Sequence, residues 1–86
     1  MKTNRNDPNY SFQHTKQRMK ERYNLDINEV EYKELCLNCI KGEKTHNEST
    51  PKGDQEIYKV MFKNIEIITV YQTWKKQVST VLYNGY

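Results

Sequence analysis

The chain has 86 residues, of which 35% are hydrophobic and 29% are charged, and its net charge is +3. This length is enough for one domain with a small core and leaves no room for a second domain. No apolar run approaches the roughly 18 residues of a membrane span, and the first residues lack the apolar segment of a secretory signal. We therefore expect a single cytoplasmic domain that is not associated with a membrane.

The charges are unevenly distributed along the chain. Residues 1–26 carry six Lys or Arg against three Asp or Glu, residues 27–56 carry four against seven, and residues 57–86 carry four against one. The two ends are therefore basic and the middle is acidic. If the ends pack together they form one basic surface, which favours nucleic acid as a partner. Ordinary solvated charge explains the same pattern equally well.

The first helix is predicted to start near Tyr10 to Phe12 and to end near Asn24, because Asn readily ends a helix. Residues 1–9 are polar, which predicts a flexible arm ahead of a single domain at residues 10–86. One face of this helix is mostly apolar and suits packing on a core. That face consists of Phe12, Thr15, Met19 and Tyr23.

A second helix is predicted after Asn28, which suits the N-cap position and has Glu31 three residues later as a capping-box partner. Apolar residues then recur with helical spacing, and Gly42 is expected to end the helix. These apolar residues are Tyr32, Leu35, Cys36, Cys39 and Ile40.

The second half of the chain predicts strands. Residues 43–55 are uniformly polar and are expected to form a loop. Residues 58–63 alternate between apolar and polar, and residues 65–72 are apolar on both faces, as in a central strand. Residues 73–76 connect this strand to a last one at residues 77–83. The sequence therefore predicts an α+β fold, with two N-terminal helices packed on a three-stranded antiparallel β-meander.

His14, Arg18 and Arg22 share one face of the first predicted helix, because residues four positions apart are neighbours on a helix. His titrates near physiological pH and is the natural acid or base for a ribonuclease that cleaves by 2′-OH attack. Arg stays charged, and its planar guanidinium suits phosphate oxygens. A solvated helix whose arginines pair with Glu21 or water is equally compatible with these residues. The hydroxyls that would complete a site are those of Tyr71, Ser79, Thr80 and Tyr83.

The motif His14-x-x-x-Arg18-Met19-x-x-Arg22, followed by a helix, a Gly and strands that end in Val78-Ser79-Thr80-Val81, resembles the RelE/BrnT-type toxin superfamily. These are compact ribonucleases grouped with barnase, EndoU and the tRNA-cutting colicins. The chain is especially similar to short His-x-x-x-Arg-Met domains related to that group, many of them in phages and mobile elements. The resemblance covers roughly residues 12–83. It implies that His14 and Arg18 are the main catalytic residues and that Arg22 and Thr80 are the next candidates.

The chain departs from the better-known toxins because its strands lack a cluster of Arg, Lys and Tyr. Lys59, Lys63 and Tyr71 are present outside any matching pattern, and we predict that they bind the substrate. Trp74 is added to this set, because a Trp followed by two Lys suits stacking on a base. Anchoring a protein partner and covering the edge of the core are the alternatives for Trp74.

The remaining candidates for metal binding or catalysis are two cysteines and a second histidine, and a structural role is favoured for the cysteines. Cys36 and Cys39 lie on the apolar face of the second helix, which predicts core cysteines and neither a metal site nor a redox site. His46, in the predicted loop, is either a second acid/base or a solvated side chain. We expect no metal ion and no cofactor.

Two function hypotheses follow. The first is an RNA-directed, toxin-like protein that acts as a metal-independent endoribonuclease through His14, Arg18 and Arg22. The second is a non-catalytic phage or mobile-element protein that binds and inhibits a host defence protein, with a contact surface made of Glu29, Glu31, Glu34 and Trp74. A DNA-binding regulator is disfavoured, because no recognition helix is apparent.

Overall fold

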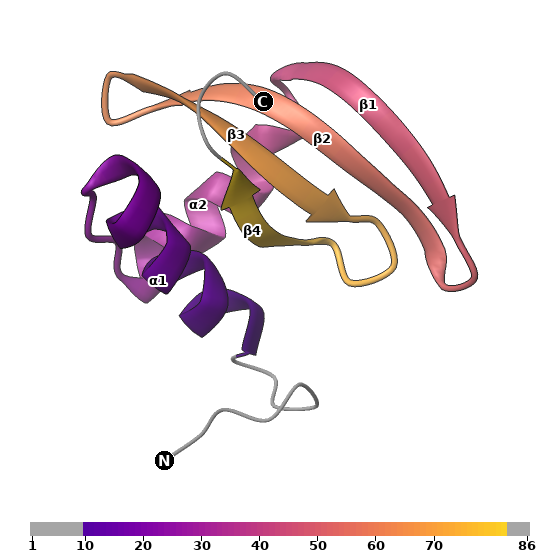
Figure 1. Cartoon of the computed structure of the whole chain (residues 1–86), viewed down its shortest axis with the longest axis horizontal. Helices are drawn as coiled ribbons and strands as arrows, with labels where there is room; N and C mark the ends of the chain where they lie inside the picture. Colours follow the sequence, from indigo (N-terminus) through magenta and orange to yellow (C-terminus); the bar gives the residue numbers. More distant parts are fainter. Residues whose placement is uncertain (1–9, 83–86) are drawn as a thin grey trace.

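The computed structural model describes residues 10–82, which form two helices followed by an antiparallel sheet (Figure 1). The α+β class and the two N-terminal helices are confirmed. The predicted arm at residues 1–9 and the predicted end of the last strand at Tyr83 lie outside the described residues. The elements are α1 (Tyr10–Tyr23), α2 (Glu29–Cys39), β1 (Glu43–Thr50), β2 (Gly53–Phe62), β3 (Ile65–Gln72) and β4 (Gln77–Leu82).

The prediction of three strands is wrong, because the sheet has four, in the order β1-β2-β3-β4. The predicted loop at residues 43–55 is strand β1, a turn and the first residues of β2. Every residue from Glu43 to Ser49 is exposed. The residues of β1 are also all polar, so neither face of the strand is apolar. The strand therefore lacks the alternating pattern by which strands are recognised. Its backbone pairs with β2 from Glu43↔Lys59 to Thr50↔Gly53.

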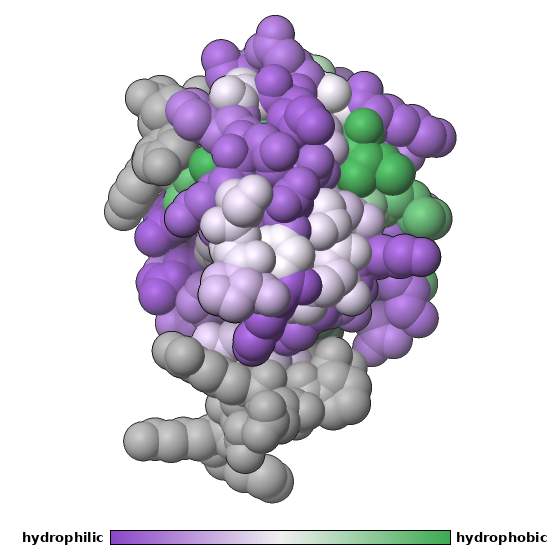
Figure 2. Space-filling model, turned by 90° about the vertical axis from the view of Figure 1, so that its right-hand side faces the viewer, coloured by the Kyte–Doolittle hydropathy of each residue, from purple (hydrophilic) through white to green (hydrophobic). Residues whose placement is uncertain are grey.

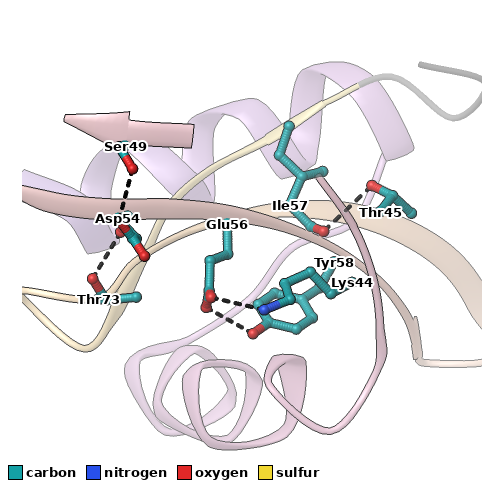
Figure 3. A network of polar contacts seen from close by, with 8 residues as sticks. All are labelled: Lys44, Thr45, Ser49, Asp54, Glu56, Ile57, Tyr58 and Thr73. Carbon is teal, nitrogen blue, oxygen red and sulfur yellow. Dashed lines mark hydrogen bonds and ion pairs between the residues drawn. The ribbon is translucent and has the colours of Figure 1, made fainter. Parts of the chain in front are cut away.

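Polar side chains reinforce the β1–β2 hairpin (Figure 3). The carboxylate of Glu56 accepts hydrogen bonds from the hydroxyl of Tyr58 at 2.7 Å and from Lys44 at 3.1 Å. Near the turn, the hydroxyl of Ser49 lies 3.3 Å from the carboxylate of Asp54. The hairpin end of the molecule is largely hydrophilic, with hydrophobic residues at the margins of this face (Figure 2).

The helix ends follow the local signals of the sequence. Asn24 takes a left-handed conformation with φ 54° directly after α1. Asn28 and Glu31 form the predicted capping box, with Asn28 accepting from the Glu31 amide at 2.8 Å and its own amide donating to the Glu31 carboxylate at 2.9 Å. The α2 helix ends at Cys39, three residues before Gly42. Gly42 lies so close to β2 that a Cβ there would be 2.4 Å from the carbonyl oxygen of Lys59.

The core lies between the two helices and one face of the sheet. The apolar faces predicted for the helices point into it, except that Ile40 lies just beyond the end of α2 and is 48% exposed, so its assignment to the apolar face was wrong. Met19, Leu35 and Cys39 have at most 1% of their surface exposed. Ile68 and Val70, whose side chains point to the other face of β3, are buried as well, so β3 is apolar and buried on both faces as predicted. Within residues 10–82, no helix is long and apolar enough to span a membrane. The buried cluster consists of Met19, Ile27, Tyr32, Leu35, Cys39, Tyr58, Val60, Ile67, Tyr71, Val78 and Val81.

Helix α1 lies along β4, and side chains of the helices bind the backbone of that strand. The carbonyl of Val78 accepts hydrogen bonds from Thr15 at 3.2 Å and from Tyr32 at 2.6 Å. The carbonyl of Leu82 accepts from the hydroxyl of Tyr23. These bonds give backbone carbonyl groups of β4 side-chain partners from the helices. They also fix the rotation of α1 and therefore the direction of its polar face.

Candidate functional site

His14 lies in the first half of α1, where its side chain is half-buried. Its ring stacks on the ring of Tyr10, one helical turn earlier, with the centroids 5.7 Å apart and the planes at 14°. Both rings border an open groove along the helix. The groove is lined by Tyr10, Gln13, His14, Lys16, Gln17, Lys20, Glu21 and Asp26.

Arg18 lies one turn after His14 and forms an ion pair with Glu21, with 2.7 Å between its guanidinium and the carboxylate. Hydrogen bonds from Arg18 and Gln17 hold the pKa of the Glu21 carboxyl below its ordinary value. The Arg18 side chain is 35% exposed and that of Glu21 is 46% exposed. Because such exposed pairs are weak, a phosphate group can replace the carboxylate as the partner of Arg18.

Arg22 continues the same face of α1 but is partly buried against the sheet. Its guanidinium donates to the carbonyl of Val81 in β4. At least one of its N–H groups therefore holds the helix to the sheet. Arg22 therefore positions α1 on the sheet, whereas His14 and Arg18, on the same face of the helix, face the solvent.

The structure does not gather the predicted strand residues around His14. Lys63 lies in the β2–β3 turn, where its ammonium group contacts the carboxylate of Glu31 at 2.7 Å and the carbonyl of Asp26 at 3.0 Å. The β3–β4 turn, which contains Trp74, lies at the opposite end of the sheet from the β2–β3 turn (Figure 1). The Trp74 ring lies over Gly53, where a Cβ would be 3.0 Å from its Cε3 atom. Lys63 and Trp74 therefore cannot bind the same small substrate.

Tyr71, Lys59 and Thr80 lie in the sheet itself. Tyr71 is in the core with 8% of its surface exposed, its ring is edge-on to that of Tyr58, and burial raises the pKa of its hydroxyl. Lys59 is half-buried and pairs with Ile68, so its side chain points to the face that the helices do not cover. Thr80 points to that same face, because it pairs with Val70, while the next residue, Val81, points into the core.

The cysteines are core residues, as predicted. Cys39 is fully buried and Cys36 is half-buried. Burial raises the pKa of the Cys39 thiol to about 12, so this group stays protonated and unreactive at neutral pH. In the part of the chain from Tyr10 to Leu82, no three His, Cys, Asp or Glu side chains lie together as they would in a metal site.

The second imidazole lies far from the first. His46 is an exposed residue of β1, next to a bulge in the pairing with β2, and its Nδ1 lies 3.1 Å from the hydroxyl of Thr45. The β1 strand is at one edge of the sheet, and α1 packs along β4 at the other. His46 is therefore not positioned to act with His14.

The sequence analysis missed Tyr10 as part of the groove, although its position four residues before His14 was a usable signal. It also missed Lys16, whose ammonium group donates to the carbonyl of Ile27 at 2.8 Å, and Lys20, which pairs with Asp26 at 3.4 Å. Comparison of the chain with protein-family models, with curated proteins and with solved structures finds no match.

Proposed function

We propose that the protein acts on RNA through the groove along α1, as a metal-independent endoribonuclease. One observation carries the proposal: an imidazole, an aromatic ring and cationic side chains border one open groove. His14 is the proposed acid/base, and Lys16 and Lys20 are the cations that line the groove. Arg18, which does not line the groove but lies one helical turn after His14, is the proposed phosphate ligand. The resemblance of the His-x-x-x-Arg-Met motif to small toxin-type ribonucleases supports the same residues.

The chemistry needs few groups. In cleavage by 2′-OH attack, a neutral imidazole accepts the proton of the hydroxyl, and an imidazolium can return a proton to the leaving 5′-oxygen. The guanidinium of Arg18 stabilises the negative charge that develops on the phosphate oxygens. The ring of Tyr10 offers an aromatic surface on which an unpaired base can stack.

Arg22 has an indirect role in this proposal. Its bond to Val81 holds α1 on β4 and so keeps His14 and Arg18 on the outer side of the helix. The proposal assigns no contact with the phosphate to Thr80, because this residue points to the face of the sheet that the helices leave uncovered.

The alternative is a non-catalytic protein that binds and inhibits a host defence protein through the acidic residues of α2 and Trp74. Two of those residues already have partners inside the chain. Glu31 is held by Asn28 and Lys63, and Trp74 covers Gly53. We therefore favour RNA as the partner over this inhibitory surface.

The test is cleavage of total cellular RNA in EDTA by the wild-type protein and by His14→Ala. We expect discrete fragments from the wild type and a loss of at least 100-fold in His14→Ala, as is typical when a general acid/base is removed. His46→Ala is the matched control, because it removes the other imidazole of the chain and should cleave like the wild type.

A second measurement separates binding from cleavage. Arg18→Ala should weaken binding of a single-stranded RNA oligonucleotide and reduce the salt dependence of that binding, because one phosphate contact is lost. If the wild type neither cleaves RNA nor binds it at low salt, the proposed function is wrong. Cleavage that survives in His14→Ala would show that the activity does not come from this groove.

A further inference from the structure

The turn between β1 and β2 and the turn between β3 and β4 lie at the same end of the sheet (Figure 1). The amide and the hydroxyl of Thr73 donate to the carbonyl of Asp54 at 3.1 Å and 2.8 Å, which ties the two turns together (Figure 3). The ring of Trp74 lies against Gly53 at this junction. Residues that are distant in the sequence are therefore neighbours here.

Three lysines flank this contact along the chain. Lys52 precedes Gly53 in the β1–β2 turn, and Lys75 and Lys76 follow Trp74 in the β3–β4 turn. All three are exposed, and none of them forms an ion pair within the described residues 10–82. We call Lys52, Trp74, Lys75 and Lys76 the turn patch. By contrast, five cationic side chains elsewhere are paired with carboxylates, namely Arg18, Lys20, Lys33, Lys44 and Lys63.

The acidic residues of the adjoining strands do not cancel the charge of the turn patch. Glu48 and Asp54 are the carboxylates closest to the β1–β2 turn in the sequence. Asp54 is half-buried, and its carboxylate accepts a hydrogen bond from Ser49 at 3.3 Å. Because three exposed ammonium groups outnumber these two carboxylates, this end of the sheet attracts anions.

We propose that the turn patch binds single-stranded RNA, with one base stacked on Trp74 and the neighbouring phosphates held by the three lysines. Trp74 is half-buried, so the contact with Gly53 fixes its position while part of the residue stays accessible to a base. An aromatic ring among cations is the usual arrangement for binding single strands. The proposal rests on the proposed function only in taking RNA as the ligand, and it requires neither His14 nor cleavage.

The composition of this end of the molecule favours a nucleic acid over a protein or a membrane. Lysine is depleted in protein–protein interfaces. A membrane-binding surface needs large apolar side chains beside its cations, whereas the hairpin end of the molecule is largely hydrophilic (Figure 2). A single strand with unpaired bases requires only a ring for stacking and ammonium groups for its phosphates.

The test uses the intrinsic fluorescence of the protein, because Trp74 is the one tryptophan of the chain. The probe is a 2′-O-methyl oligouridine of about ten nucleotides, which lacks the attacking 2′-hydroxyl and is therefore not cleaved during the measurement. Titration of the full chain at low salt should quench the fluorescence saturably, because a base stacks on the indole. The same strand annealed to its complement should quench far less, since its bases are already paired.

Two double variants of equal charge locate the phosphate contacts. Lys52→Gln/Lys75→Gln should make the plot of log affinity against log salt shallower by about 1.4, since each contact with a single strand contributes about 0.7. Between about 50 and 200 mM salt, the wild type should therefore lose roughly 7-fold more affinity than this variant. Lys41→Gln/Lys44→Gln is the matched control at the other end of β1 and should keep the wild-type slope. Circular dichroism of each variant checks that the fold is retained.

Four results would overturn the proposal. The first is absence of quenching by the oligouridine at low salt; if the wild type nevertheless cleaves total RNA, the proposed function stands and the turn patch alone is refuted. The second is an equal change of slope in both double variants, which would make net charge the cause. The third is equal quenching by the duplex, which excludes stacking. The fourth is a blue shift with phosphatidylserine-containing vesicles but no quenching by RNA, which would make the partner a membrane.

Discussion

The hydroxyl of Tyr23 joins α1 to the ends of two strands, and its removal tests how the helix is fixed on the sheet. It donates to the carbonyl of Leu82 in β4 and accepts the amide of Ile68 in β3 at 3.1 Å. Ile68 and Leu82 are paired in the register of these strands, so the hydroxyl completes the ladder at this point. Tyr23→Phe removes the oxygen and keeps the ring.

We expect Tyr23→Phe to lower the free energy of unfolding by about 1–2 kcal/mol, because two hydrogen bonds worth about 1 kcal/mol each are lost. The lower end applies if water replaces the hydroxyl, since the site is only partly buried. For a domain of this size, the loss corresponds to a fall in Tm of roughly 6–12 °C.

Thermal and urea unfolding followed by circular dichroism measure the loss of stability, and hydrogen exchange of the Ile68 amide locates it. Tyr10→Phe is the matched control, because the ring of Tyr10 stacks on His14 and its hydroxyl has no hydrogen-bond partner among residues 10–82. If Tyr23→Phe is as stable as Tyr10→Phe and Ile68 stays protected, the hydroxyl does not hold α1 to the sheet.

Three further predictions concern the rest of the fold. Burial raises the pKa of Cys39 and of Tyr58 to about 12, from ordinary values of 9.0 and 10.0. The unfolded chain therefore releases protons that the folded chain keeps, so the urea midpoint should be level from about pH 6 to about pH 8 and should fall as the pH rises from about 8 to about 12. Gly42→Ala should lower the free energy of unfolding by about 1–3 kcal/mol in urea titrations, because the new Cβ would lie 2.4 Å from the carbonyl of Lys59; a wild-type midpoint would contradict that close approach. Asn28→Ala should cost about 1 kcal/mol by the same titration and speed amide exchange in the first turn of α2, and unchanged exchange would argue against the capping box.

The helices could be predicted because their signals are local. The capping box joins residues three positions apart, and the left-handed residue that follows α1 is an Asn. The apolar stripes of both helices follow the helical period, and the buried residues Met19 and Leu35 were found in this way. Strand β3 was found for the same reason, since a strand buried on both faces is a continuous apolar run.

Strand β1 could not be predicted from its residues. Its side chains are polar and almost all exposed, so its sequence shows no alternation between apolar and polar residues. It is a strand because its backbone pairs with β2 across a short turn and because ion pairs such as Lys44–Glu56 join the two strands. These are contacts between segments, and the composition of one segment does not reveal them.

The same distinction between local signals and long-range contacts applies to the candidate site. The sequence by itself determined that His14 and Arg18 are neighbours, because the spacing of four residues and the helical period suffice for that. Only the tertiary structure decided which groups surround them, since strand register and the packing of α1 on β4 set the direction of every other side chain. Tyr71 points into the core, Lys63 binds Glu31 at the far end of the sheet, and Arg22 is held by the carbonyl of Val81. A residue's type gives the chemistry it can perform, but contacts between distant segments decide what it can reach.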